Sequence, residues 1–222
     1  AKKLIWTHFF LILFFFLDME GKVFIFPRQS TSDYVVLNPR LTEPLDKLTT
    51  CLRSYTDLLK NHALISVDFP GSQDRHMMAF PWVRCREIMG LGGIPSFLFK
   101  EINKVNHVRN HICVTWDSNT GVLQLWVNGK VFIRRALQKG FSIDLQDNIS
   151  LGQMRRYYGP RSETMIPFQG EITDVNMWNR ILPPGIIKQI PLNSSVNGNV
   201  ISWRSLSYTI KGNVIVQPKL YL

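Results

Sequence analysis

The sequence lacks the residue patterns of the common enzyme classes. It has no Gly-x-Ser-x-Gly nucleophile motif, no His-Glu-x-x-His zinc motif, no Walker loop and no dinucleotide-binding fingerprint. Only five histidines are present, and an enzyme site needs several titratable groups that converge on one point. Cys85 and His76 could act as nucleophile and base, but no third residue orients them. We therefore expect that the protein is not an enzyme.

Long helical patterns, repeats and linkers are also missing. Residues 20–222 contain no internal repeat, low-complexity tract or linker, which favours a single domain. Charged residues make up 19% and apolar residues 45%, the balance of a globular protein. A chain of 222 residues is long enough to bury a substantial core.

Short apolar or alternating segments, separated by turn residues, fill the chain instead. Short strands at this density are typical of an all-β sandwich or barrel. We predict strands at residues 23–26, 34–37, 48–55, 63–69, 77–83, 111–116, 122–127, 130–135, 200–203 and 213–217.

The clearest stretch is an antiparallel meander in the middle of the chain. A polar loop joins residues 111–116 to 122–127, and Asn128-Gly129 then gives the strongest hairpin signal. Both central residues of a type I′ turn have positive φ, which asparagine and glycine tolerate best. This meander rules out a parallel βαβ plan. One short helix is predicted at 185–190, directly after Pro183-Pro184.

The one long apolar run lies at the N-terminus. Two lysines precede Leu4–Leu17, which only Thr7 and His8 interrupt, the pattern of a secretory signal peptide. The run is shorter than the roughly 20 residues of a transmembrane helix, and no small-x-small cleavage signal follows it. We predict a signal peptide over 1–17 with an atypical cleavage site, and a secreted domain over 18–222 that does not insert stably into a membrane. A segment that stays uncleaved and tethers the chain to a membrane is the alternative.

Positive charge exceeds negative charge. Lysine and arginine total 26 against 16 acidic residues, which gives a formal net charge of +10. Such an excess can indicate an anionic partner or only solubility and weak adhesion. Arg134-Arg135 and Arg155-Arg156 are short basic clusters. A protein that binds heparin or nucleic acid is one interpretation of them, and the solvated side of a strand is the other.

The chain has only three cysteines. In an oxidising compartment two can pair, and a bridge from Cys51 to Cys113 leaves Cys85 over. This bridge would close a loop of about 62 residues and constrain the unfolded chain by roughly 4 kcal/mol. Cys85 is then either a small buried hydrophobic residue or a thiol that reacts or pairs with another molecule.

The run from His111 to Ser118 carries a family resemblance. His111-Ile-Cys-Val-Thr-Trp-Asp-Ser118 agrees with the pentraxin signature, His-x-Cys-x-Ser/Thr-Trp-x-Ser/Thr, at every defined position. The chain resembles the short pentraxins of the C-reactive protein and serum amyloid P type from about Lys22 to Leu222. Further landmarks follow in the expected order: Phe24–Pro27, Leu41–Pro44, Trp126–Lys130, Leu151–Gln153, Val175–Trp178 and Asn199–Trp203.

This resemblance implies a fold, an assembly and a ligand. The fold is a two-sheet antiparallel jelly roll of the lectin-like kind with one helix, and Cys51 pairs with Cys113 in it. The assembly is a flat ring of five copies, a homopentamer. The function is that of a secreted recognition protein of innate immunity and the acute phase, which binds phosphocholine or another anionic group through two calcium ions. The tryptophans of the landmark strands, above all Trp116, are expected in the core.

The sequence departs from the family at most of the calcium positions. Calcium prefers six to eight oxygen ligands, and by resemblance only Asp74 and Glu163 keep an acidic side chain there. Arg155 stands where a backbone carbonyl is the ligand, and Phe80 stands at an aromatic wall for choline. The expected asparagine, glutamate, aspartate and glutamine are replaced by Arg75, Met154, Arg156 and Ile166. We expect that calcium binding is weak or absent and that the two acids are vestigial.

Three interpretations of these changed segments stay open, and one of them is a disordered loop. Asp74 and Glu163 can form ion pairs with Arg75 and Arg156. Alternatively, Arg75, Arg155, Arg156 and Arg161 bind phosphate or carboxylate without a metal, because a guanidinium matches these groups with two hydrogen bonds. Phe80, Arg155 and Arg156 are then the ligand-binding candidates. The predicted function is a pentraxin-like recognition protein, and the alternatives are a calcium-independent polyanion binder or a diverged paralogue without function.

Overall fold

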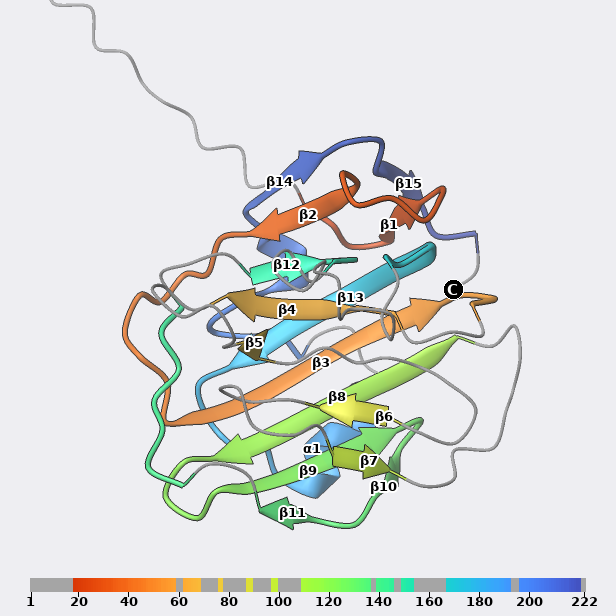
Figure 1. Ribbon diagram of the computed structural model, residues 1–222. Helices are drawn as coiled ribbons and strands as arrows, with labels where there is room; N and C mark the ends of the chain where they lie inside the picture. The colour runs from red at the N-terminus through yellow and green to blue at the C-terminus, as the bar shows by residue number, and fades with distance from the viewer. Residues whose placement is uncertain are drawn as a thin grey trace, which may run out of the picture.

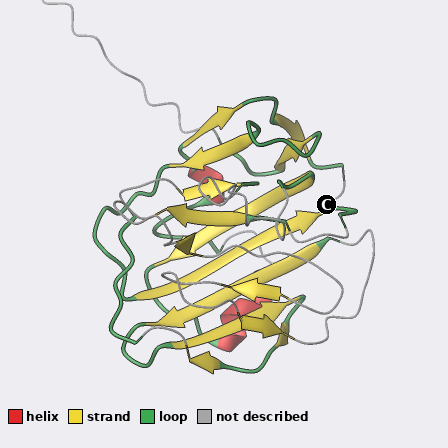
Figure 2. Ribbon diagram, in the orientation of Figure 1, coloured by secondary structure: helices red, strands yellow, loops and turns green. Residues whose placement is uncertain are grey.

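Two large antiparallel sheets and a separate two-stranded sheet form the described part of the molecule (Figure 1). The computed structural model describes residues 18–58, 62–68, 76–77, 87–89, 97–99, 109–136, 139–145, 149–153, 167–192 and 196–220. Strands dominate both layers, and helix is scarce (Figure 2). The predicted all-β antiparallel sandwich with one short α-helix is confirmed for this part of the chain. The predicted signal peptide at 1–17 lies outside it.

The larger sheet has eight strands in the order β10-β9-β8-β3-β13-β1-β15, with β11 also paired to β9. Its long central strands pair in an unbroken register from Lys47↔Asp117 to Ser54↔Asn110. The strands are β1 (Lys22–Phe26), β3 (Lys47–Tyr55), β8 (Asn110–Asp117), β9 (Val122–Val127), β10 (Lys130–Val131), β11 (Arg135–Ala136), β13 (Gly170–Trp178) and β15 (Ile215–Pro218).

The smaller sheet has five strands in the order β14-β2-β12-β4-β5. These are β2 (Tyr34–Leu37), β4 (Ile65–Asp68), β5 (His76–Met77), β12 (Ile149–Leu151) and β14 (Tyr208–Lys211). A separate pair consists of β6 (Glu87–Met89) and β7 (Phe97–Phe99).

The main core lies between the two sheets. Side chains alternate along a strand, so Ile112, Val114 and Trp116 of β8 all join this core. Leu37 of β2 and Leu151 of β12 enter it from the smaller sheet. As predicted, Trp116 is fully buried.

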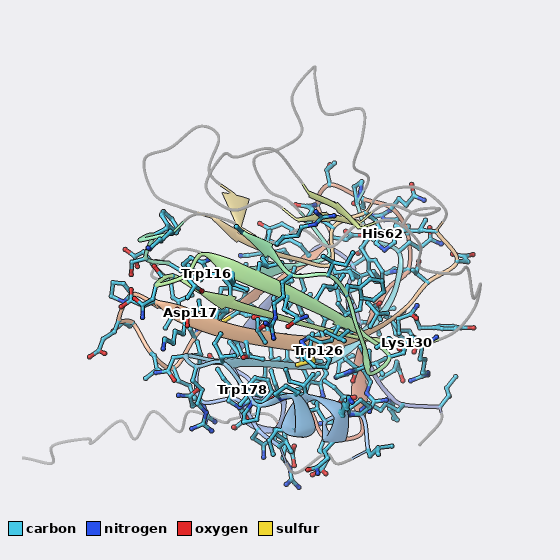
Figure 3. The ribbon with its side chains drawn as sticks, turned by 90° about the horizontal axis from the view of Figure 1, so that it is seen from below. His62, Trp116, Asp117, Trp126, Lys130 and Trp178 are labelled. Carbon is cyan, nitrogen blue, oxygen red and sulfur yellow. A yellow bond between two sulfur atoms is a disulfide. The ribbon has the colours of Figure 1, made fainter. Side chains whose placement is uncertain are left out.

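A second apolar cluster covers the outer face of the larger sheet. The alternate residue Cys113 points to this side together with Cys51 and Trp126. The helix α1 (Pro184–Gln189) closes it with Ile187, and Trp178 lies in it as well. Figure 3 shows Trp126 and Trp178 on the helix side of the sheet and Trp116 on the other side. Because β3 and β8 are covered on both faces, they are buried along most of their length.

The predicted hairpin is confirmed, but the strand after it is interrupted. Asn128 and Gly129 have φ of 49° and 76°, as a type I′ turn requires. The predicted strand 130–135 is split into β10 and β11, because Val131 pairs with Trp126 while Arg135 pairs with Leu123. Four residue steps on one strand therefore oppose three on the other, which is a β-bulge.

The predicted strand 200–203 is wrong. Only Ile201 forms a bridge there, to Met177, and a short 3-10 helix follows at Trp203–Ser205. The backbone N–H of Trp203 donates to the side-chain oxygen of Asn176 at 3.2 Å instead of to a strand. This asparagine also accepts from the N–H of Gly198, so one side chain replaces two ladder bonds. Among the described residues no helix is long and apolar enough to cross a membrane.

Candidate functional site

The chain segments with the predicted calcium positions leave from the smaller sheet. β5 begins at His76 and pairs with β4 through Asp68↔His76, and β12 ends at Leu151, a few residues before the second segment. The predicted site residues themselves lie outside the described residues: Asp74, Arg75, Phe80, Met154, Arg155, Arg156, Arg161, Glu163 and Ile166. Cys85 also lies outside them.

The two ends of segment 154–166 are pinned to each other and to the sheet. The N–H of Phe168 donates to the carbonyl oxygen of Gly152 at 2.9 Å, and the N–H of Gly152 donates to Leu64 at 3.0 Å. Gly152 has φ of +83°, and a Cβ there would lie 2.3 Å from the ring of Phe26. Only glycine allows the chain to leave β12 so close to this ring.

Hydrogen bonds of buried polar groups also hold the start of segment 154–166. The side-chain N–H of Gln153 donates to the carbonyl oxygen of Ser30 at 3.1 Å, and the Ser66 hydroxyl donates to the backbone carbonyl of Gln153 at 2.8 Å. Gln153 is 2% exposed and Ser66 is wholly buried. A buried polar group without a partner is costly, so these bonds fix the start of the segment to two different parts of the fold.

Aromatic rings pack around Phe168, at the second end of segment 154–166. Phe168 packs edge-on against Phe26 with ring centroids 5.3 Å apart, and against the buried His62 at 5.4 Å. His62 lies on the side of the larger sheet away from the helix (Figure 3). We call Gly152, Gln153, Ser66 and Phe168 the loop base.

Sequence reasoning missed the role of the loop base. It treated Leu151–Gln153 as a family landmark and found no function for its glutamine. The signal that could have been used is a long polar side chain next to a buried strand, directly before a segment of changed residues. Such a residue has to make its hydrogen bonds inside the fold.

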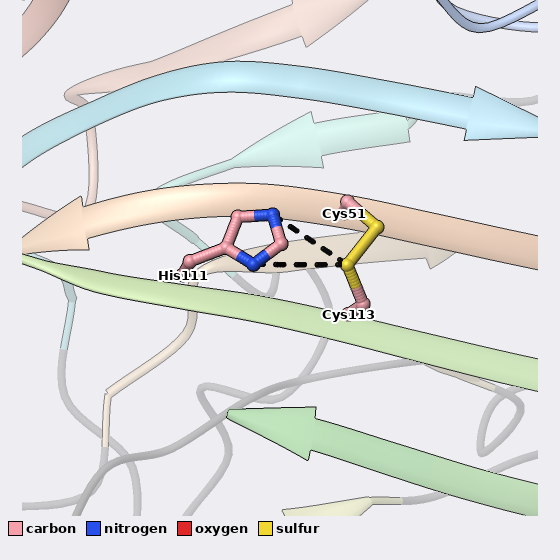
Figure 4. A group of neighbouring side chains, drawn as sticks. All are labelled: Cys51, His111 and Cys113. Carbon is pink, nitrogen blue, oxygen red and sulfur yellow. Dashed lines mark hydrogen bonds between the residues drawn. A yellow bond between two sulfur atoms is a disulfide. The ribbon is translucent and has the colours of Figure 1, made fainter. Parts of the chain in front are cut away.

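The disulfide lies on the opposite side of the larger sheet from the main core. Cys51 and Cys113 are bonded and face each other in the register of β3 and β8, which confirms the pairing implied by the resemblance. His111 lies beside them, with its Nε2 3.6 Å from the Cys113 sulfur (Figure 4). The three residues bring their ligand atoms within 4.8 Å. Both sulfurs are consumed by the bridge, so no thiolate is left to bind a metal.

His111 is uncharged at neutral pH. Its burial, and after that the positive charge of Arg53, lower the pKa of His111 from 6.5 to about 4, against a smaller raising effect of Asp174. A buried neutral imidazole suits the apolar surroundings of the bridge.

Asp174 is the centre of a cluster of ion pairs on the same outer face. It has φ of 55°, which is rare for a residue other than glycine, and it lies where the pairing of β13 with β3 shifts by a bulge. Its carboxylate is 3.0 Å from Arg53 and 2.7 Å from Lys219. Arg53 also donates to the carbonyl oxygen of Pro191 after the helix. These contacts connect β13 and β3 with the residue that follows β15 and with the turn after the helix, and they could not be predicted from the sequence.

The sheet order, the one α-helix in the described part of the chain and the core between the sheets define an antiparallel jelly-roll sandwich. The pentaxin family model matches residues 22–218. The chain belongs to the pentaxin, or pentraxin, family.

Relatives and a solved structure agree with this assignment. Serum amyloid P-component of Cavia porcellus is 33% identical over 229 residues, which cover 99% of each chain. C-reactive protein of Sus scrofa is 37% identical and covers 92% of this chain and 90% of that protein. The native heptameric SAP-like pentraxin from Limulus polyphemus has the same fold, with a TM-score of 0.74 at 18% identity, and covers 92% of this chain and 98% of that one.

Proposed function

We propose that this chain is a secreted, non-enzymatic recognition protein of the innate immune type, which binds an anionic ligand without needing calcium. Membership of the family of serum amyloid P-component and C-reactive protein supports the recognition role. The disulfide supports a route through an oxidising compartment. The predicted signal peptide at 1–17 agrees with that route, and sequencing the N-terminus of the secreted protein would test its cleavage.

One observation carries the loss of calcium: the residues at the family's metal positions do not fit the ion. Of the side chains expected to supply oxygen, Asp74 and Glu163 alone do so. Met154 and Ile166 have no oxygen in their side chains, and Arg75 and Arg156 add positive charge. Two unit charges of the same sign 4 Å apart repel by about 4 kcal/mol at an effective dielectric near 20. A divalent ion would be repelled more strongly still.

The loop base suggests that this chain differs from its family in the side chains that would bind calcium and not in the strands that carry them. Gly152 and Phe168 hold both ends of segment 154–166, and Gln153 is held on both its backbone and its side chain. These contacts need no metal ion. We therefore infer that the segment can be retained on the fold after the calcium ligands are lost.

Arginine chemistry suggests what replaces the metal. Arg75, Arg155, Arg156 and Arg161 give four guanidinium groups in the two segments, and each can bind a phosphate, sulfate or carboxylate with two hydrogen bonds. A polyanion such as heparin or a nucleic acid is the second candidate ligand. It is favoured by the formal net charge of +10.

The test is a calcium titration of the purified protein beside a restored variant. Wild-type protein should give no heat of binding and no terbium luminescence with micromolar metal. The variant Arg75→Asn, Met154→Glu, Arg156→Asp and Ile166→Gln should gain stoichiometric binding, because it supplies the oxygens that the family uses. Arg161→Ser is the matched control, since it removes a charge from the same segment without supplying a family ligand. Stoichiometric micromolar binding by wild type would refute the proposal.

Ligand binding needs a separate measurement. Retention on phosphocholine and heparin columns should be the same with calcium and with a chelator, and should fall steeply with salt. If neither column retains the protein above physiological salt, the chain has no anionic ligand of this kind and is a diverged paralogue. Binding that a chelator abolishes would contradict calcium independence.

We propose that the protein assembles as a closed ring of identical subunits. The solved relative from Limulus polyphemus is a heptamer, and the resemblance to short pentraxins implies five copies. Light scattering after size-exclusion chromatography would give the subunit number, and a mass of one chain would contradict the ring.

A further inference from the structure

The residues at the disulfide become a set of soft metal ligands when the bridge is reduced. Cys51 and Cys113 face each other in the register of β3 and β8, and His111 lies two residues before Cys113 in the same strand. Because alternate residues of a strand point to one face, all three side chains lie on the outer face of the larger sheet (Figure 4). Their ligand atoms lie within 4.8 Å of one another.

The imidazole of His111 is a buried polar group without a strong partner. The residue is 5% exposed. Its Nε2 lies 3.6 Å and its Nδ1 4.0 Å from the Cys113 sulfur, and sulfur is only a weak hydrogen-bond acceptor. In the part of the chain that the structure describes, the ring makes no hydrogen bond to a nitrogen or an oxygen. Because buried polar groups are normally paired, a ring that faces only sulfur indicates a ligand.

The distance between the ring and the sulfur suits an ion that both of them bind. A sulfur about 2.3 Å and a nitrogen about 2.0 Å from one metal, at an angle of about 120°, lie about 3.8 Å apart. The 3.6 Å between Nε2 of His111 and the sulfur of Cys113 is close to this value. After reduction the sulfur of Cys51 can turn about its own χ1 to complete the set, while the register of β3 and β8 keeps the two backbones in place.

The surroundings of the three ligands favour cuprous copper. The apolar cluster under the helix α1, with Trp126, Trp178 and Ile187, covers the site, so water does not reach it as a further ligand. A structural zinc site needs four ligands, whereas the described residues offer three. Thiolates are soft ligands that Cu⁺ prefers, and this ion accepts three ligands in a plane.

A cluster of charges next to the site matches such a complex. Cu⁺ bound by two thiolates carries one net negative charge. Arg53 lies opposite His111 in the register, and Arg53 and Lys219 both pair with Asp174, at 3.0 Å and 2.7 Å. These three residues together carry one net positive charge. Because opposite charges attract more strongly in a buried setting than in water, the cluster offsets the charge of the complex.

We propose that the folded chain with reduced Cys51 and Cys113 binds one Cu⁺ ion through both sulfurs and His111. Every copy has these two thiols before the bridge forms, and a dithiol recreates them. The dithiol gives two electrons and two protons to the bond between the sulfurs and is itself oxidised to a disulfide. The ion then displaces the two thiol protons to solvent. Metal and bridge exclude each other, since they use the same sulfurs. The inference depends neither on calcium nor on the anionic ligand.

Competition for Cu⁺ with a chromophoric chelator, bathocuproine disulfonate, measures the binding. All proteins carry Cys85→Ala, so that only the two thiols of the bridge are counted. The parent protein, reduced with a dithiol and freed of it under nitrogen, should take one Cu⁺ per chain and gain the near-ultraviolet absorption of copper–thiolate bonds. The oxidised protein should take none.

Variants identify the ligands. His111→Phe and Cys51→Ser each lack one ligand and should bind at least about 100-fold more weakly, because even the loss of a residue that only orients a ligand costs about 10- to 100-fold. His62→Phe is the matched control. It removes another buried imidazole, on the side of the larger sheet away from the helix, and should keep the affinity of the parent. His111→Leu replaces the phenylalanine variant if that one does not fold.

Circular dichroism separates the loss of a ligand from the loss of the fold. If the reduced parent unfolds without metal, one equivalent of Cu⁺ should restore the native spectrum, because an ion that binds only the folded chain stabilises it. A spectrum that stays unfolded would overturn the inference. Equal affinities of the parent and His111→Phe would overturn it as well, and so would tighter binding of Zn²⁺ than of Cu⁺. The calcium titration and the column retention of the oxidised protein are scored on their own.

Discussion

Replacing Cys51 and Cys113 together with alanine should lower the free energy of unfolding by about 5 kcal/mol. The bridge spans a sequence separation of 62 residues, for which the chain-entropy model gives about 4 kcal/mol at 25 °C. Both residues are wholly buried in the cluster with Trp126 and Trp178. Removing the two sulfur atoms leaves a small cavity there, which adds about 1 kcal/mol.

Urea unfolding of wild type and the double variant, followed by tryptophan fluorescence, measures this difference. Cys85→Ala is the control, because it removes a cysteine and keeps the bridge. Its free energy of unfolding should stay within about 1 kcal/mol of that of wild type unless Cys85 is itself a buried contact. Mass mapping of the oxidised protein should find the Cys51–Cys113 peptide pair. A loss below about 2 kcal/mol in the double variant would show that the unfolded chain is not constrained as the entropy model assumes.

Three further substitutions test local features. His111→Phe should make the free energy of unfolding depend less on pH between pH 6.5 and 4. In this range the unfolded chain binds a proton at His111 that the folded chain, in which its pKa is about 4, does not bind, so wild type loses up to about 3 kcal/mol of stability as the pH falls. The same pH dependence in wild type and variant would contradict this prediction. Asp33→Ala should cost about 2 kcal/mol at pH 7. Burial of the Asp33 carboxyl is outweighed by its hydrogen bonds to Arg28, Asn213 and Ser32, which lower its pKa below 3.8, so the cost of the substitution should shrink as the pH falls through that lowered pKa. A cost that does not change during an acid titration of both proteins would show that the charge is irrelevant. Gly152→Ala should lower the free energy of unfolding by about 2 kcal/mol or more, because of the positive φ and the clash with Phe26. Gly140→Ala is the control, since Gly140 has a similar φ of +78° but open space where the Cβ would lie. Equal losses of stability in urea unfolding of the two variants would mean that the clash is absent.

Local features of the fold were predictable from the sequence. The hairpin at Asn128-Gly129 depends on two residues that accept positive φ, and the core position of Trp116 follows from the alternation of its strand. The break at residues 132–134 was not predictable, because it comes from where β11 finds its partner on β9 and not from the residues in the break.

The candidate site divides in the same way. The identities at the calcium positions, such as Met154 in place of a glutamate, could be read directly from the aligned motif. The anchor of Gln153 could not, because its partners Ser30 and Ser66 lie far away in the sequence and meet it only in the folded chain. The ion pairs of Asp174 were missed for the same reason, as they join residues of β3 and β13 to Lys219, which follows β15.

The hydrogen bond from Phe168 to Gly152 makes the segment between them replaceable. A connection whose two ends are already held together needs no particular span to cross, and its closure entropy grows only slowly with its length. Foreign sequences, shorter or longer, can therefore be grafted between Gln153 and Pro167 without moving the strands on either side. For the same reason, members of the family can change the residues of this segment, and with them the ligand that they bind, while the core stays the same.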